Sequence, residues 1–191
     1  MNLNEYQAKA LRTSGEGHDR IENGLMGLMG ECGEIVDLLK KHIFQSSIDA
    51  DLPVDKLEKE TGDVLWYCAE FATGMGMKLS EVASYEENYS SCMALRERFM
   101  ARVSRLCLKR TAISMLSYAV EAYQHFYDRD DLYLTLWSVS RLMALINHLC
   151  KTLDMPITHV MEQNIEKLLA RYPDGFDPER SMHRPEYQQT T

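Results

Sequence analysis

Two stretches decide the fold: GLMGLMGECGEIVDLL at residues 24–39 and LEKETGDVLWYCAEFA at residues 57–72. Each is apolar on a helical period, and each carries two carboxylates three positions apart: Glu31 and Glu34, then Glu60 and Asp63. On a helix, residues at this spacing project from one face. Acidic groups on an apolar face repel one another and lose hydration unless a cation neutralises them. The two pairs therefore predict a hard divalent cation with oxygen ligands, held between two helices.

Composition places the chain among globular proteins. Its 191 residues are 45% hydrophobic and 26% charged, enough for a full core in one domain or in two closely packed halves. The net charge of −8 and pI near 5.3 argue against nucleic-acid binding, which needs a basic surface. The five cysteines lack C-x-x-C spacing, which favours reduced core residues in a cytoplasmic protein. No signal peptide or membrane span is predicted, so no membrane partner is expected.

The periodicity predicts an all-α helical bundle. Helices are expected at residues 3–12, 21–44, 55–74, 93–110, 111–127, 132–153 and 158–171. Ser80 is expected to cap a further helix that begins at residue 81. The last twenty residues contain three prolines and are predicted to be irregular.

The second half of the chain repeats the first in a degenerate form. The small residues of one helix recur in another, because Gly24, Gly27 and Gly30 align with Thr111, Ser114 and Ser117. Such a repeat predicts two tandem helical halves that form an internal pseudo-dimer. The carboxylates are not repeated: Tyr118 aligns with Glu31, while Ser138 and Arg141 align with Glu60 and Asp63. Arg141 is expected either to cap the lost site or to pair with Glu121.

The acidic motifs resemble those of the MazG-like branch of the all-α nucleoside triphosphate pyrophosphohydrolases. That superfamily also contains the dimeric dUTPases and the dCTP pyrophosphatases. Its hallmark is an E-x-x-E motif followed, after a spacer, by an E-x-x-D motif. This chain is similar, with Glu31-x-x-Glu34 as the first motif, residues 35–59 as the spacer and Glu60-x-x-Asp63 as the second motif. The resemblance covers residues 1–88 closely and returns at about 150–180.

The resemblance implies hydrolysis of a (deoxy)nucleoside triphosphate to a monophosphate and pyrophosphate with Mg²⁺, Mn²⁺ being the alternative ion. Carried over by position, the catalytic residues and metal ligands are the four carboxylates Glu31, Glu34, Glu60 and Asp63. Asn164, Lys167 and Arg171 share one face of the last helix, where the family holds the triphosphate. Substituting Lys167 is accordingly expected to raise KM for the nucleotide while Mg²⁺ affinity stays close to wild type.

Three segments are expected: residues 1–92 as the catalytic half with the metal site, 93–172 as the degenerate half, and 173–191 as the tail. The leading function is control of the nucleotide pool, with dUTP or dCTP slightly favoured. A non-catalytic nucleotide-binding or regulatory protein, and a hydrolase of a signalling nucleotide, are the alternatives. Trp66 and Tyr67 either face a base or ribose or pack in the core. Both a monomer and a homo-oligomer stay open, because an internal repeat can replace a dimer.

Overall fold

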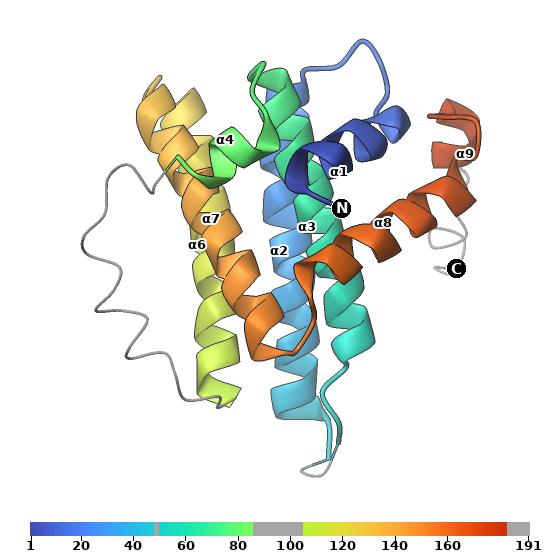
Figure 1. Ribbon diagram of the computed structural model, residues 1–191. Coiled ribbons are helices and arrows are strands. Elements are labelled where there is room, and N and C mark those ends of the chain that lie inside the picture. Colours follow the sequence, from blue (N-terminus) through green and yellow to red (C-terminus); the bar gives the residue numbers. More distant parts are fainter. Residues whose placement is uncertain (48–49, 86–104, 183–191) are drawn as a thin grey trace.

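A computed structural model describes residues 1–47, 50–85 and 105–182. Within these ranges the chain forms helices and no strand, so the predicted all-α class is confirmed. Four long helices lie side by side (Figure 1). They are α2 (Arg20–Gln45), α3 (Val54–Gly74), α6 (Arg105–Tyr127) and α7 (Leu132–Thr152). The second pair of long helices, which the repeat predicted, is therefore present.

The bundle consists of two antiparallel hairpins, α2 with α3 and α6 with α7, that meet along α2 and α6 (Figure 1). Helix α2 buries a stripe at spacings of three and four residues: Leu25, Leu28, Cys32, Ile35 and Leu39. Burial of this stripe removes apolar surface from water and provides much of the free energy that holds the hairpin together.

The glycines of α2 have two different roles. A Cβ atom added at Gly24 would lie 2.8 Å from the backbone nitrogen of Phe71 on α3, so only glycine permits this approach of the two helices. A Cβ atom at Gly27 would lie 2.1 Å from the ring of Tyr67. Gly30 and Gly33 have no such neighbour within 4 Å among the described residues. Of the predicted stripe of small residues, Gly24 and Gly27 therefore serve close packing against α3, and Gly30 and Gly33 do not.

Short helices and α8 cover one side of this bundle. Helix α1 (Leu3–Ala10) continues into the 3-10 turn η1 (Leu11–Thr13). Helix α8 (Ile157–Arg171) contacts α3 and α1, and Figure 1 shows it crossing the long helices obliquely. Helix α4 (Leu79–Ala83) contacts α7 and α1. Because α8 packs on α3, residues far apart in the sequence meet at the carboxylates.

Three local predictions differ from the structure. Helix α6 runs unbroken through residues 110 and 111, because Leu108, Thr111, Ala112 and Met115 continue one buried stripe. Helix α4 begins at Leu79 with Lys78 at the N-cap position, and the Lys78 amide donates to the Glu81 carboxylate at 2.8 Å. A short helix, α9 (Pro178–Met182), lies within the tail that was predicted to be irregular. The start of the helix predicted at 93–110 lies outside the described residues.

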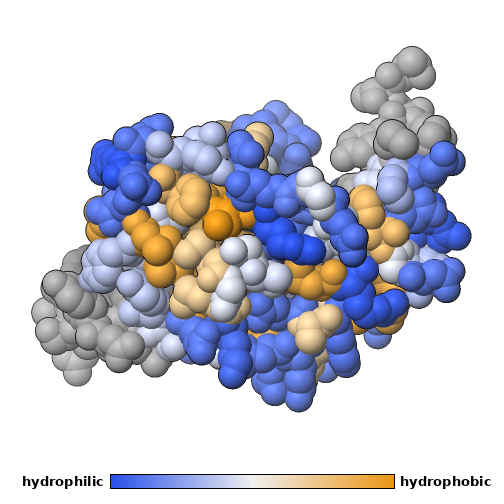
Figure 2. Space-filling view, turned by 90° about the horizontal axis from the view of Figure 1, so that it is seen from above, coloured by the Kyte–Doolittle hydropathy of each residue, from blue (hydrophilic) through white to orange (hydrophobic). Residues whose placement is uncertain are grey.

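The interior is mostly apolar, and among the described residues the carboxylate of Glu70 and the guanidinium of Arg141 are the charged groups buried in it, beside two buried histidines, His42 and His125. Cys32, Cys68 and Cys150 are free thiols in buried positions, as expected for core cysteines. Seen from above, hydrophilic residues cover much of the surface, and hydrophobic residues reach it in patches between them (Figure 2). Among the described residues, no helix has the length and hydropathy needed to cross a membrane. The pseudo-dimer relation and the three segment boundaries stay predictions.

Candidate functional site

Three of the four predicted metal ligands come together between α2 and α3. One carboxylate oxygen from each of Glu31, Glu60 and Asp63 lies within 4.8 Å of the others, and all three residues are half-buried. Glu34 lies one turn further along α2, where it is exposed and outside this group. The arrangement offers a divalent cation three oxygen ligands from two helices.

The electrostatics of this group fit a bound cation. Burial, followed by the charges of Asp63 and Glu60, raises the pKa of Glu31 to about 7. Burial and the charge of Asp63 likewise raise the pKa of Glu60 above its ordinary value. Lys167 opposes both shifts but does not cancel them. The ammonium of Lys167 therefore leaves part of the negative charge of the three carboxylates uncompensated. A divalent ion would relieve the repulsion between them.

Helix α8 contributes two of the predicted phosphate-binding residues to this same group. The Lys167 ammonium forms an ion pair with the Asp63 carboxylate, and Asn164 Nδ2 donates to Asp63 Oδ1 at 3.0 Å. Asn164 is only 4% exposed, and its Oδ1 accepts from the Tyr6 hydroxyl at 2.7 Å. The structure thus places both polar groups on Asp63, one of the predicted metal ligands. The expectation that Lys167 is independent of the metal has to be revised, because a cation at Asp63 and the ammonium compete for one carboxylate.

A pocket of about 350 Å³ opens beside the carboxylates. Glu31 and Asp63 line one part of it, and Arg171, the third predicted phosphate-binding residue, also lines it. Trp66 and Tyr67 form part of the wall, and their rings meet edge to face with centroids 4.9 Å apart. Both aromatic residues therefore reach the pocket as well as packing against the core.

Two contacts fix this aromatic wall. The Trp66 Nε1–H group lies 3.3 Å from the carbonyl oxygen of Ala10 and 3.2 Å from the hydroxyl oxygen of Thr13. The Tyr67 ring rests over Gly27, where any larger residue would displace it. The sequence around η1 and the glycines of α2 thus determine where the aromatic rings stand.

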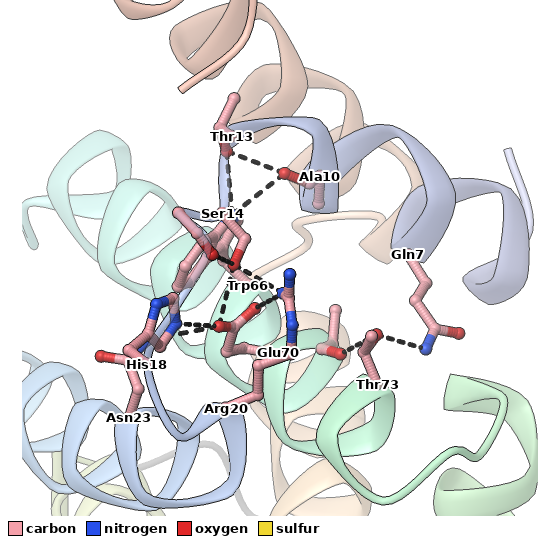
Figure 3. Close-up of polar contacts among 12 residues, drawn as sticks. Gln7, Ala10, Thr13, Ser14, His18, Arg20, Asn23, Trp66, Glu70 and Thr73 are labelled. Carbon is pink, nitrogen blue, oxygen red and sulfur yellow. Dashed lines mark hydrogen bonds and ion pairs between the residues drawn. The ribbon is translucent and has the colours of Figure 1, made fainter. Parts of the chain in front are cut away.

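Glu70 is a polar residue of this region that the sequence analysis missed. It is completely buried on α3, and four donors surround its carboxylate (Figure 3). They are Ser14 Oγ at 2.9 Å, His18 Nε2 at 2.7 Å, Arg20 Nη1 at 3.0 Å and Asn23 Nδ2 at 3.5 Å. The available signal was an acidic residue within the apolar run C-A-E-F-A, seven positions after Asp63 and so on the same face of the helix.

A cluster of Arg141, Tyr118 and Trp137 joins α6 and α7 at positions that include two which the predicted repeat aligns with Glu31 and Asp63. The Arg141 guanidinium lies over the rings of Tyr118 and Trp137, with its central carbon 5.8 Å and 5.7 Å from the two ring centroids. Arg141 is buried, and cation–π contacts of this kind stabilise a guanidinium away from water. Tyr118 and Arg141, which the predicted repeat aligns with Glu31 and Asp63, are thus in contact.

Comparison with known proteins agrees with this geometry. Residues 20–86 match the model of the MazG nucleotide pyrophosphohydrolase domain, a segment that contains all four predicted carboxylates. The Gene 37 protein of Mycobacterium phage L5 is 35% identical over 74 residues, which are 38% of this chain and 63% of that protein. No solved structure matches the chain. The predicted resemblance is confirmed: residues 20–86 are a MazG-like segment within an all-α protein.

Proposed function

We propose that this chain hydrolyses a (deoxy)nucleoside triphosphate to a monophosphate and pyrophosphate, with Mg²⁺ or Mn²⁺ as its cofactor. In the cell it would control or cleanse the cytoplasmic nucleotide pool. The observation that carries the proposal is the group formed by Glu31, Glu60 and Asp63, whose oxygens lie within 4.8 Å of one another beside a pocket. The MazG-like match over the same helices supports it.

The residues of the site have distinct roles in this reaction. Glu31, Glu60 and Asp63 would hold the metal, and we keep Glu34 as a fourth ligand because its exposed carboxylate lies one turn away on α2. When bound, the metal would neutralise phosphate oxygens and lower the pKa of an attacking water. A carboxylate of the group is the nearest base to accept the proton of that water.

Helix α8 would supply the grip on the phosphates. Lys167 pairs with Asp63 in the structure, so a cation arriving at Asp63 would release the ammonium toward phosphate oxygens in the pocket. Arg171 lines that pocket and can contact the same oxygens. Asn164 is held by Tyr6 and orients Asp63, which makes it a positioning residue in this proposal.

The test is pyrophosphate release from a panel of dNTPs and NTPs with Mg²⁺. Wild type is compared with Asp63→Asn, Glu31→Gln and Glu34→Gln, and Asp37→Asn is the matched control. Asp37 lies one turn beyond Glu34 on α2 and pairs with Lys40 and Lys41 instead. Activity should fall to background in Asp63→Asn and Glu31→Gln and persist in the control.

Metal binding is measured separately by calorimetric titration of Mg²⁺ and Mn²⁺. Asp63→Asn and Glu31→Gln should lose most of the heat of metal binding. The heat measured for Glu34→Gln decides whether Glu34 is a ligand. If wild type releases no pyrophosphate from any nucleotide, the proposed reaction is wrong, and the non-catalytic nucleotide-binding protein becomes the better description.

A further inference from the structure

The buried carboxylate of Glu70 takes no part in the proposed reaction, yet two of its partners, His18 and Asn23, line the same pocket as the proposed metal ligands Glu31 and Asp63. Asp63 and Glu70 are seven positions apart on α3, so they share a face and lie about 10 Å apart along the helix axis. Trp66 stands between them on that face and also lines the pocket. A nucleotide with its phosphates at Asp63 and its length along α3 would bring its base to the Glu70 end.

At that end, two polar side chains line the pocket and are held from behind by Glu70. The imidazole of His18 contacts the carboxylate through Nε2 at 2.7 Å, and the carboxamide of Asn23 contacts it through Nδ2 at 3.5 Å. An ionised carboxylate can only accept hydrogen bonds, so it faces the donor atom of each partner. The other polar atom of each side chain, His18 Nδ1 and Asn23 Oδ1, is therefore turned away from Glu70.

These outward atoms are both hydrogen-bond acceptors. In a neutral imidazole with its proton on Nε2, the Nδ1 atom accepts, and a carboxamide oxygen accepts in every state. Arg20 supplies the charge that balances Glu70, because its Nη1 lies 3.0 Å from the carboxylate oxygen Oε2. Ser14 adds a neutral donor at 2.9 Å. The carboxylate is thus fixed by its own partners and keeps the donors of His18 and Asn23 directed inward (Figure 3).

We propose that His18 and Asn23 form an acceptor-lined base subsite, with Glu70 as the positioning residue, that selects nucleotides whose base carries an exocyclic amino group. Cytosine and adenine present such a donor, whereas uracil and hypoxanthine place a keto oxygen at the same position. A keto oxygen there would set acceptor against acceptor and leave His18 Nδ1 and Asn23 Oδ1 without a donor. This inference rests on the proposed function and names its substrate class.

The test compares nucleotide pairs that differ at this group, dCTP with dUTP and dATP with dITP. Assays run at pH 8, above the ordinary imidazole pKa of about 6.5. We expect kcat/KM to favour the amino member by about tenfold or more, because the keto member leaves a hydrogen-bonding group of the site without its partner. Calorimetry with non-hydrolysable α,β-imido analogues should give the same order of affinities without turnover.

Two variants test the role of Glu70. In Glu70→Gln the new amide offers a donor of its own, so the Asn23 carboxamide can turn over, and the amino-to-keto ratio should fall toward one. Ser14→Ala is the matched control, because it removes one hydrogen bond to Glu70 and leaves both pocket-facing groups in place, and the ratio should be retained. His18→Ala removes a side chain that is 35% exposed, so we expect this variant to fold, and it should lower the ratio even if Glu70→Gln fails to fold.

The outcomes separate this inference from the proposed reaction. Equal kcat/KM and equal analogue affinity within both pairs would overturn the base subsite while the reaction stands. A ratio that falls as far in Ser14→Ala as in His18→Ala would indicate general loosening and would also overturn it. Discrimination between the analogues without pyrophosphate release would support the subsite and count against the reaction.

Discussion

The close approach of α2 and α3 at Gly24 gives a quantitative test of the packing that holds the site. In Gly24→Ala, the new Cβ atom would lie 2.8 Å from the backbone nitrogen of Phe71 and 2.9 Å from its Cα atom. Backbone atoms cannot rotate away as a side chain can, so the two helices would have to separate. The matched control is Gly30→Ala on the same helix, where the Cβ atom meets nothing within 4 Å among the described residues.

The expected magnitudes follow from two opposing terms. Replacing glycine by alanine inside a helix stabilises it by about 1 kcal/mol. Gly30→Ala should show this gain alone, because its position is exposed. In Gly24→Ala, overpacking costs about 1–3 kcal/mol and offsets or exceeds the gain. The helix propensity cancels in the difference between the two variants, so Gly24→Ala should be less stable than Gly30→Ala by about 1–3 kcal/mol.

The assay is equilibrium urea unfolding of wild type and both variants, with Mg²⁺ absent so that binding does not contribute. Comparable m-values would show that the unfolded states match, and the midpoints then report the free energy of unfolding. Equal stability of the two variants, or a more stable Gly24→Ala, would refute the close approach of α2 and α3 at Gly24. The geometry of the carboxylates depends on that approach.

Three further outcomes are expected. Tyr6→Phe should destabilise the fold by about 1–2 kcal/mol in urea unfolding, because Asn164 Oδ1 loses its buried donor. Lys167→Met should raise KM for the nucleotide and tighten Mg²⁺ binding in calorimetry, since the ammonium no longer competes for Asp63. Raising the pH from 6 to 8 should increase the gain in Tm on adding Mg²⁺. The pKa of Glu31 is raised to about 7, so at pH 6 the metal-free protein holds a proton on this carboxyl, and Mg²⁺ must displace that proton to bind. At pH 8 the carboxyl is already ionised, and binding no longer has this cost.

Each of these has a contrary result. Unchanged stability in Tyr6→Phe would mean that water or another group satisfies Asn164. Weaker Mg²⁺ binding in Lys167→Met would mean that the ammonium supports the metal site. The pH argument further requires that the metal-free protein become less stable as the pH rises through about 7, because a carboxyl with a raised pKa favours the folded state only while protonated. A Mg²⁺ effect independent of pH would contradict it.

The periodicity of apolar residues was sufficient for the fold class and for most helix limits. The helices predicted at 21–44, 55–74 and 132–153 correspond to α2, α3 and α7. No end of these helices is misplaced by more than one residue. The errors arose where local signals compete with packing. Ser80 is a good cap by residue type, but its amide donates to Asn4 Oδ1 of α1 and the helix starts earlier. Residues 110–111 carry no helix-breaking signal, and a continuous buried stripe keeps α6 whole.

The four carboxylates and their two helices can be predicted from the sequence alone, because a spacing of three residues on an apolar helix is a local property. Only the tertiary structure decided which of them meet: Glu31, Glu60 and Asp63 converge, and Glu34 stays outside. Tertiary packing also brings Asn164 and Lys167 to Asp63, and it surrounds the Glu70 carboxylate with donors from the segment before α2 and from the first turn of α2. Some of these contacts join residues more than a hundred positions apart, and they depend on how helices cross, which no local pattern encodes.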